Sequence, residues 1–180
     1  MPAPTSADVL AGLTGTSPRI LDPSPDVPAE PGLYAWWAAR DVLPAMPGPD
    51  YPTGGVRLLY VGKATRLRDR ILRNHLAPAT AQSTLRRSLA GLLMDEAGWS
   101  TRRVGRQRPK VALTASSERE LTTWMRRHLS LTWSIAVDPA SVEDAVVARL
   151  LPPLNLNFTP DSCHRRAVAG ARDRFKLSAP

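Results

Sequence analysis

Two tyrosines, a lysine and an arginine stand at positions where their side chains could act together on a phosphate group. Tyr34 lies in a short apolar segment, and Tyr60 lies near the end of a second one, which passes through Lys63 into a basic segment containing Arg70. If the two apolar segments pair as neighbouring strands, the tyrosines come close together, with the lysine at the turn and the arginine on the following helix. Guanidinium and ammonium groups both bind phosphate oxygens. The spacing therefore indicates a phosphate-binding site rather than core packing.

The charge of the chain also favours a polyanionic partner. The 180 residues carry a formal net charge of +8, and the sequence pI is about 10.7. Residues 1–56 have a net charge of −4, so the rest of the chain carries +12. Solubility alone does not require such segregation, and basic surfaces attract nucleic acid. We predict a nucleic-acid partner; a basic surface without a ligand is the alternative.

Cysteine content and hydropathy exclude several classes of protein. The single cysteine, Cys163, excludes an internal disulfide and a zinc site built from cysteines. No apolar run approaches the length of a membrane-spanning helix, and the Pro-rich N-terminus lacks the basic start and apolar core of a signal peptide. We therefore expect a soluble, cytoplasmic protein with no membrane partner.

Proline spacing and charge divide the chain into three parts. Residues 1–28 are predicted to be a Pro-rich N-terminal arm with a short helix around 6–13. Residues 29–158 are predicted to form one domain with an insertion at about 77–115, and residues 159–180 a basic C-terminal tail of uncertain order. This length suffices for one domain with a sizeable core.

Hydrophobic periodicity predicts an α/β fold, more strictly α+β, in which helices flank a small, mainly antiparallel three-stranded sheet. The predicted strands of the sheet are 31–38, 56–61 and 131–137. The predicted helices are 66–76, 83–97, one from Ser116 or Ser117 to 129 with a capping box between Ser117 and Glu120, and one capped by Ser141 that stops before Pro152. The insertion is predicted to contain the second of these helices, a very basic loop or hairpin at 101–110 and a short strand at 111–114.

Two segments carry the basic side chains that we predict to bind DNA. On the predicted helix 66–76, the spacing of Arg66, Arg70 and Arg73 places them on one face. The predicted DNA-binding residues are Arg66, Arg68, Arg73, Arg102, Arg103, Arg106, Arg108 and Lys110. Such side chains hold backbone phosphates. For the segment 101–110, the alternative is a solvated loop without a ligand.

The two tyrosines belong to triplets that resemble a known signature. Gly-Leu-Tyr at 32–34 and Tyr-Val-Gly at 60–62 resemble the two motifs of the GIY-YIG nuclease superfamily. That superfamily includes the incision domain of the bacterial excision-repair nuclease, homing endonucleases and some restriction enzymes. The sequence Tyr-Val-Gly-Lys-Ala at 60–64 is similar to the excision-repair version in particular.

Further positions extend the resemblance over about 31–75 and 131–157. Arg70 lies ten residues after Tyr60, where the family has an arginine. Glu143 is followed by a proline nine residues later and by Asn155 twelve residues later, which is the spacing of the family's metal-binding glutamate. Some members carry a histidine four residues beyond the arginine; here that residue is Asn74, and His75 follows it.

The resemblance implies an endonuclease that hydrolyses DNA, whether duplex, branched or damaged, with Mg²⁺ or Mn²⁺ as cofactor. The implied catalytic residues are Tyr34, Tyr60, Lys63, Arg70, Glu143 and Asn155, with Glu143 as the metal ligand. Arg70 would stabilise charge in the transition state, and Asn155 would fix the geometry of the glutamate or of a tyrosine. The resemblance leaves open which tyrosine, or whether Lys63, activates the attacking water.

Each of these assignments has a structural alternative. Glu143 could be a first-turn acid favoured by the helix dipole, with Asp144 as an adjacent candidate ligand. His75 and His128 are interpreted as surface or packing residues. The alternative function is a nucleic-acid-binding or structure-recognition module with little or no cleavage, and a third is a protein-interaction domain with a basic tail. A binding module has no need of a carboxylate amid so much positive charge, which favours the enzyme.

Overall fold

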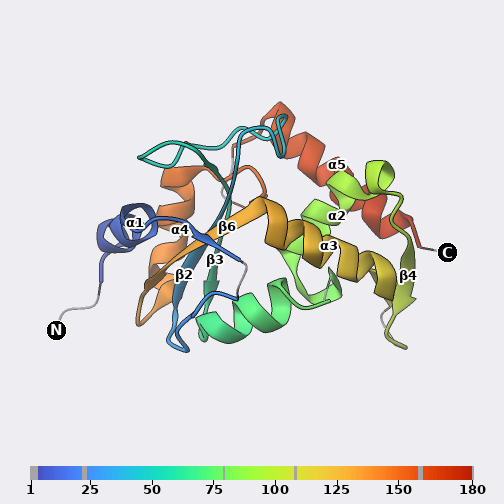
Figure 1. The fold of residues 1–180 in the computed structure, drawn as a ribbon, viewed down its shortest axis with the longest axis horizontal. Coiled ribbons are helices and arrows are strands. Elements are labelled where there is room, and N and C mark those ends of the chain that lie inside the picture. Colours follow the sequence, from blue (N-terminus) through green and yellow to red (C-terminus); the bar gives the residue numbers. More distant parts are fainter. Residues whose placement is uncertain (1–3, 22–23, 79, 108, 158–159, 180) are drawn as a thin grey trace.

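The structure is a computed structural model in which residues 4–21, 24–78, 80–107, 109–157 and 160–179 are described. A four-stranded antiparallel sheet lies between two groups of helices (Figure 1). Its strand order is β1-β6-β2-β3, where β1 is Arg19–Ile20, β2 is Gly32–Ala38, β3 is Arg57–Ala64 and β6 is Leu129–Ile135. The three long strands confirm the predicted antiparallel sheet, and the two-residue strand β1 adds a fourth that the sequence did not predict.

Side chains along the central strand β2 point alternately to the two faces of the sheet, where they pack in two separate cores. Leu33, Ala35 and Trp37 pack against one group of helices, formed by α1 (Ser6–Gly15) and α4 (Pro139–Leu150). Tyr34 and Trp36 face the other group. Because both faces are covered, every residue of β2 is buried, as expected for the central strand of a sheet packed on both sides.

The second group of helices comes largely from segments after β3. It consists of the π-helix η1 (Asp69–His75), the 3₁₀ turn η2 (Thr80–Gln82), and the helices α2 (Thr84–Ala97), α3 (Ala115–His128) and α5 (Cys163–Leu177). Side chains from η1, α2, α3 and α5 share one core with Tyr34 and Trp36. A buried ion pair between Arg86 and Glu118, 2.6 Å long, joins α2 to α3.

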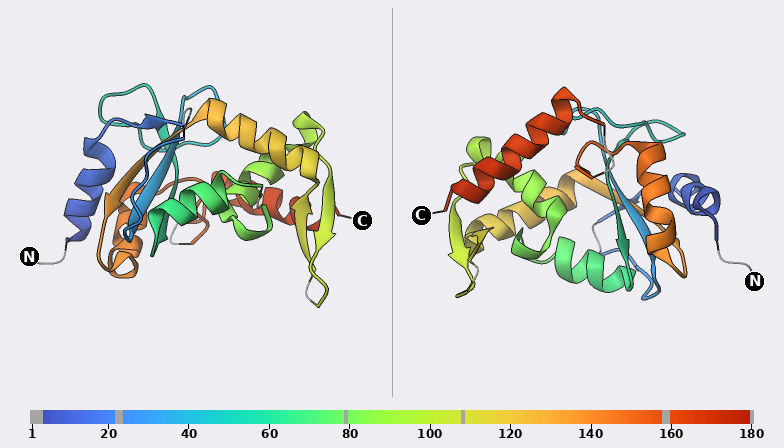
Figure 2. Two further views of the ribbon diagram at one scale, coloured as in Figure 1. Left: turned by 60° about the horizontal axis from the view of Figure 1, so that its bottom comes forward. Right: turned by 180° about the vertical axis from the view of Figure 1, so that it is seen from behind.

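The basic segment at 101–110 belongs to a hairpin. Strand β4 (Thr101–Val104) pairs antiparallel with β5 (Lys110–Leu113) in a separate two-stranded sheet. Figure 2 shows this hairpin beside α3 and α5, at the opposite end of the molecule from α1.

The C-terminal segment differs from the expected tail, because α5 is a helix packed along α2. Its buried side chains are Val168, Ala171 and Phe175, whose spacing forms one face of a helix. The two helices approach closely at Gly91, where an added Cβ would overlap the carbonyl oxygen of Ala171. The basic exposed residues between these positions hide the apolar face when the segment is judged by composition alone.

The N-terminal segment also packs on the sheet. Helix α1 is close to the predicted 6–13 and buries Val9 and Leu13 against α4 and β2. Gly12 lies against Ser134 of β6, where an added Cβ would collide with the serine side chain. Helix α1 is therefore part of the folded domain rather than of a detached arm.

Two predicted helix caps were wrong. Thr114, not Ser116 or Ser117, is the N-cap of α3. Ser117 therefore lies inside the first turn and the Ser117–Glu120 box does not form; Glu120 accepts a hydrogen bond from Trp99 Nε1 at 2.9 Å. Helix α4 begins at Pro139 after Asp138, whose carboxylate accepts from two backbone N–H groups, so Ser141 lies inside the first turn. The predicted end of α4 before Pro152 agrees with the structure. None of the helices in the described part of the chain is long and apolar enough to span a membrane.

Candidate active site

The register of β2 and β3 brings the two tyrosines to one face of the sheet. Tyr34 pairs with Gly62, and Trp36 pairs with Tyr60, so the tyrosines are diagonal neighbours with ring centroids 6.4 Å apart. Both rings are at least nine-tenths buried, and burial is the main cause that raises the pKa of each phenol. Both tyrosines are therefore neutral near pH 7.

The glycines of the two triplets make room for this arrangement. A Cβ on Gly62 would lie 2.6 Å from Cζ of Tyr34 and closer still to its hydroxyl oxygen. A Cβ on Gly32 would overlap the carbonyl oxygen of Ser134 on β6. Gly62 therefore provides space for the tyrosine hydroxyl, and Gly32 allows β6 to pair closely with β2.

His75 contacts the hydroxyl of Tyr34, although the sequence analysis interpreted it as a surface or packing residue. Its Nε2 lies 2.7 Å from Tyr34 Oη, and its Nδ1 lies 2.8 Å from Ser83 Oγ. Since Arg70 Nε donates to Tyr34 Oη at 3.2 Å, the phenol proton is available to His75 Nε2. Burial, followed by the charges of Arg70 and Arg86, holds the pKa of His75 well below its usual value, so the ring is neutral and accepts that proton.

The π-helix accounts for the contact of His75 with Tyr34. In η1 the backbone bonds run from residue i to i+5, as in the bond from Leu76 N to Ile71 O of 2.9 Å. Each hydrogen-bonded turn of this helix therefore contains one more residue than a turn of an α-helix. His75, five residues after Arg70, occupies the position that the fourth residue after Arg70 would have in an α-helix. The sequence signal for this contact is the spacing of five residues from Arg70 to His75, which α-helical periodicity does not assign to a shared face.

Arg70 links the tyrosines to a surface groove. Its half-buried guanidinium contacts Tyr34 and also Gln82 O at 3.5 Å. Burial acts to lower the pKa of Arg70, but its interactions with Tyr34 and Tyr60 outweigh burial and raise it. The groove, about 640 Å³ in volume, is lined by Arg70 together with Lys63, Arg66 and residues of the β6–α4 connection. Arg70 can thus present its charge to a ligand in this groove.

Glu143 enters the site from α4. Its carboxylate accepts from Lys63 Nζ at 2.8 Å, and that hydrogen bond is the largest cause raising the pKa of Lys63. Glu143 also lines a small pocket of about 160 Å³ with Tyr60 and Asn155, whereas the neighbouring Asp144 is exposed. The structure therefore places Glu143, rather than Asp144, beside the tyrosines.

Asn155 binds the outer edge of β3 directly after Tyr60. Its Oδ1 accepts from Val61 N at 3.0 Å and its Nδ2 donates to Val61 O at 2.8 Å, so the amide pairs with the strand as a neighbouring backbone would. The adjacent Leu154 N donates to Leu59 O at 3.0 Å. Asn155 thus fixes the backbone on which Tyr60 stands.

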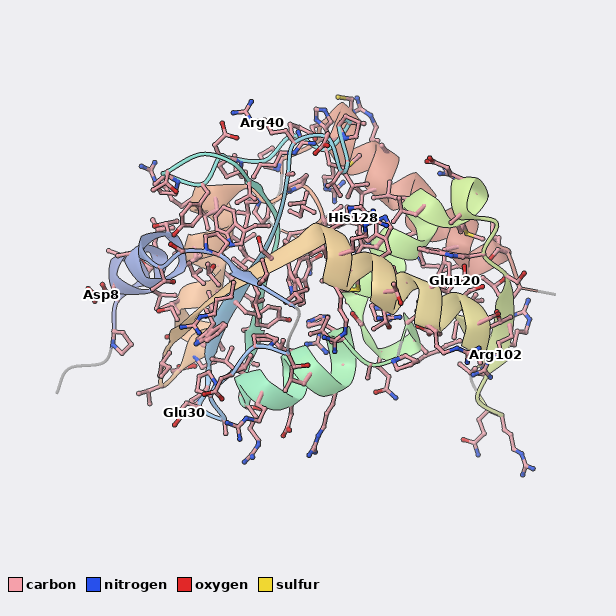
Figure 3. All side chains as sticks on the ribbon, in the orientation of Figure 1. Asp8, Glu30, Arg40, Arg102, Glu120 and His128 are labelled. Atoms are coloured by element: carbon pink, nitrogen blue, oxygen red, sulfur yellow. The ribbon has the colours of Figure 1, made fainter. Side chains whose placement is uncertain are left out.

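The predicted DNA-binding arginines fall into two separate places. Arg66 lines the groove, Arg73 lies in the last turn of η1, and both pair with Asp69, while Arg68 Nε donates to Val27 O at 2.8 Å. The other predicted residues lie on the β4–β5 hairpin, and Figure 3 shows Arg102 at the end of the molecule opposite Asp8 of α1. Arg108 lies outside the described residues.

Comparison with known proteins identifies the family. The family model described as the GIY-YIG catalytic domain matches residues 32–174, from the first triplet through the π-helix and α4 into α5. No curated protein and no solved structure gives a significant match to the chain. The matched region contains Tyr34, Tyr60, Arg70, Glu143 and Asn155, which the fold gathers around the paired ends of β2 and β3. The chain therefore belongs to the GIY-YIG catalytic domain family, a family of nucleases.

Proposed function

We propose that this protein is a metal-dependent endonuclease that hydrolyses phosphodiester bonds in DNA. The observation that carries the proposal is Glu143, whose carboxylate lines a small pocket with Tyr60 and Arg172 and is paired with Lys63. Positive charge alone binds DNA, whereas a carboxylate repels it. A carboxylate maintained in such a place is better explained by a cation that it holds during cleavage.

The residues present fit a single divalent ion with few protein ligands. In the described part of the chain, no three His, Cys, Asp or Glu side chains are close enough to hold a metal together. Mg²⁺ needs hard oxygen donors and keeps most of its waters, so one carboxylate can anchor it. Glu143 would hold Mg²⁺ or Mn²⁺, and the ion would supply polarisation of the phosphate and a lower pKa for a bound water.

The protein's own residues would orient the reacting groups. Tyr60 lines the pocket with Glu143, and as a neutral phenol it can donate a hydrogen bond to a phosphate oxygen or position the attacking water. Tyr34 is more deeply buried and is held between Arg70 and His75, so its role is to fix the arginine. Arg70 then faces the groove with its fork oriented to stabilise charge that develops on the phosphate.

DNA contacts outside the cleavage site would come from basic side chains on η1 and on the hairpin. Arg66 and Arg73 are both exposed. Arg66 lines the groove, and Arg73 pairs with Asp69, which also lines it, so both can follow the backbone of a bound strand. The hairpin residues Arg102, Arg103 and Arg106 lie beyond α3 and would reach only flanking DNA (Figure 2). DNA, in duplex, branched or damaged form, is the proposed substrate.

One observation favours a second candidate function, a DNA-binding module without cleavage. The carboxylate of Glu143 is already engaged by Lys63, and a permanent ion pair there would block a metal. The two functions differ in whether a divalent ion displaces this pair.

The test is incubation of supercoiled plasmid, branched DNA and damaged duplexes with the protein in Mg²⁺, Mn²⁺ or EDTA. We expect nicked or linear products only with metal, and none from Glu143→Gln, which keeps the shape but loses the charge. Asp144→Asn is the matched control, because it removes the same charge from the next, exposed position. Binding without cleavage under every metal condition would establish the second function instead.

A further inference from the structure

Two arginines that belong to neither triplet lie beside the candidate active site. Arg172 of α5 donates through Nε to Ser88 Oγ at 2.7 Å and through an NH2 group to Leu154 O at 2.8 Å. Arg87 of α2 donates to Ala81 O at 3.0 Å and to Thr84 Oγ1 at 3.1 Å. Both guanidiniums are half-buried. Arg172 lines one small pocket with Tyr60 and Thr84, and Thr84 is the residue whose hydroxyl accepts from Arg87. The positive charges of both arginines act to lower the pKa of Tyr60, against the effect of burial.

These positive charges are not neutralised by the residues around them. Among the described residues, no carboxylate lies within ion-pair distance of Arg70, Arg87 or Arg172, and every acceptor that the three use is a neutral oxygen. Glu143, which lines the same pocket as Arg172, is paired with Lys63. Burial and the proximity of Arg87 lower the pKa of Arg172 to about 10. Grouping half-buried like charges opposes folding unless an anion later joins them.

The hydrogen bonds hold the Arg172 side chain in place and leave other donors for a ligand. A guanidinium has five N–H donors, of which Ser88 and Leu154 use two. Arg172 lines the 160 Å³ pocket together with Tyr60, Glu143 and Asn155. Lys63, which lines the groove, is ion-paired with Glu143, which lines the pocket, so the groove and the pocket adjoin at this pair. A strand bound in the groove can therefore continue toward Arg172.

We propose that Arg87 and Arg172 form a second phosphate-binding subsite, which holds a backbone phosphate next to the one that is cleaved. The ligand is a phosphodiester of the nucleic-acid strand. This proposal rests on the proposed function, because the adjacent site is the proposed cleavage site. Binding of a phosphate by Arg87 and Arg172 nevertheless requires neither the metal nor catalysis. Its two residues come from the insertion and from the C-terminal helix, which pack together through the close approach of Gly91 and Ala171.

The test measures DNA binding in EDTA, where cleavage is absent. A fluorescently labelled duplex is titrated at several salt concentrations with wild type, Arg87→Gln, Arg172→Gln and Arg174→Gln. Each lost phosphate contact reduces the slope of log K against log salt by about 0.9 for duplex DNA. We expect the Arg87 and Arg172 variants each to reduce the slope by about one unit. Arg174→Gln is the matched control, because it removes the same charge from an exposed position on the same helix and should leave the slope unchanged.

The salt slope separates binding from a structural defect. A misfolded fraction lowers the apparent affinity equally at every salt concentration and leaves the slope as it was. Arg172→Gln loses the hydrogen bond to Leu154 O and could fail to fold. In that case the Arg87→Gln variant tests the subsite, because the hydrogen bonds of Arg87 lie within the η2–α2 turn. Slopes equal to that of Arg174→Gln would overturn the subsite. A reduced slope in a protein that cleaves no DNA with any metal would support the subsite and reject the nuclease.

Discussion

Tyr34 and Gly62 face each other across β2 and β3, and the hydroxyl of the tyrosine occupies the space that a Cβ at position 62 would need. The third residue of the second triplet thus determines where the phenol of the first triplet lies. That hydroxyl also contacts Arg70 and His75, so the space left at Gly62 bears on the contacts among three side chains of the candidate site.

Gly62→Ala should displace the Tyr34 hydroxyl and disturb its contacts with Arg70 and His75. Overpacking of this kind costs about 1–3 kcal/mol, so the thermal unfolding midpoint should fall by several degrees. Cleavage should fall further than the folded fraction does. Gly15→Ala is the control, because an added Cβ at the end of α1 meets nothing within 4 Å. Equal midpoints for the two variants would mean that the strands absorb the methyl group without strain.

His75 should make the protein less stable as the pH falls below neutrality. Its folded-state pKa lies well below the unfolded value of about 6.5, so its contribution is fully present above pH 6.5. As the pH falls, only the unfolded chain takes up the proton, and stability decreases by at most about 1.4 kcal/mol per pH unit. Unfolding free energies at pH 7.5 and 5.5 should therefore differ more for wild type than for His75→Gln. Replacement of the half-exposed His164 by Gln should leave the wild-type difference intact.

Arg70→Ala should lower the turnover number by roughly two orders of magnitude or more, as for loss of other groups that stabilise transition-state charge. The Michaelis constant should change far less, because exposed arginines on the same segment remain to hold DNA. Arg73→Ala removes an equal charge that is already paired with Asp69 and should affect mainly the Michaelis constant. An Arg70 variant with normal turnover but weak substrate binding would assign this residue to phosphate positioning.

Lys63→Ala should increase the affinity of the site for a divalent ion. In the structure the Lys63 ammonium is ion-paired with the Glu143 carboxylate, so a metal ion must displace it. A partly exposed ion pair of this kind contributes up to about 1 kcal/mol of interaction free energy. Calorimetric titration with Mn²⁺ should therefore show a dissociation constant lower by about two- to fivefold. Arg66→Ala serves as control, since it removes a neighbouring charge that pairs with Asp69. An unchanged constant for Lys63→Ala would show that metal and ammonium do not compete.

The sequence alone was enough to find the two triplets, the strands that carry them and the spacing from Glu143 to Asn155. These features are local, because side chains alternate along a strand and a cap or a proline acts on its own helix. The prediction of an antiparallel sheet between helices followed from the same patterns. The predicted N-caps of α3 and α4 were wrong, because more than one residue near each helix start could accept from the first backbone N–H groups.

Tertiary structure decided the remainder. His75 reaches Tyr34 because η1 adopts π-helical hydrogen bonding, and no periodicity rule for α-helices places it there. Arg87 and Arg172 are 85 positions apart in the numbering. Their helices lie side by side because α5, a segment that its composition suggested was a tail, packs along α2. Periodicity shows which face of a helix is apolar, but not which helix will cover it. That choice depends on the burial of side chains such as Val168 and Phe175 against distant parts of the chain.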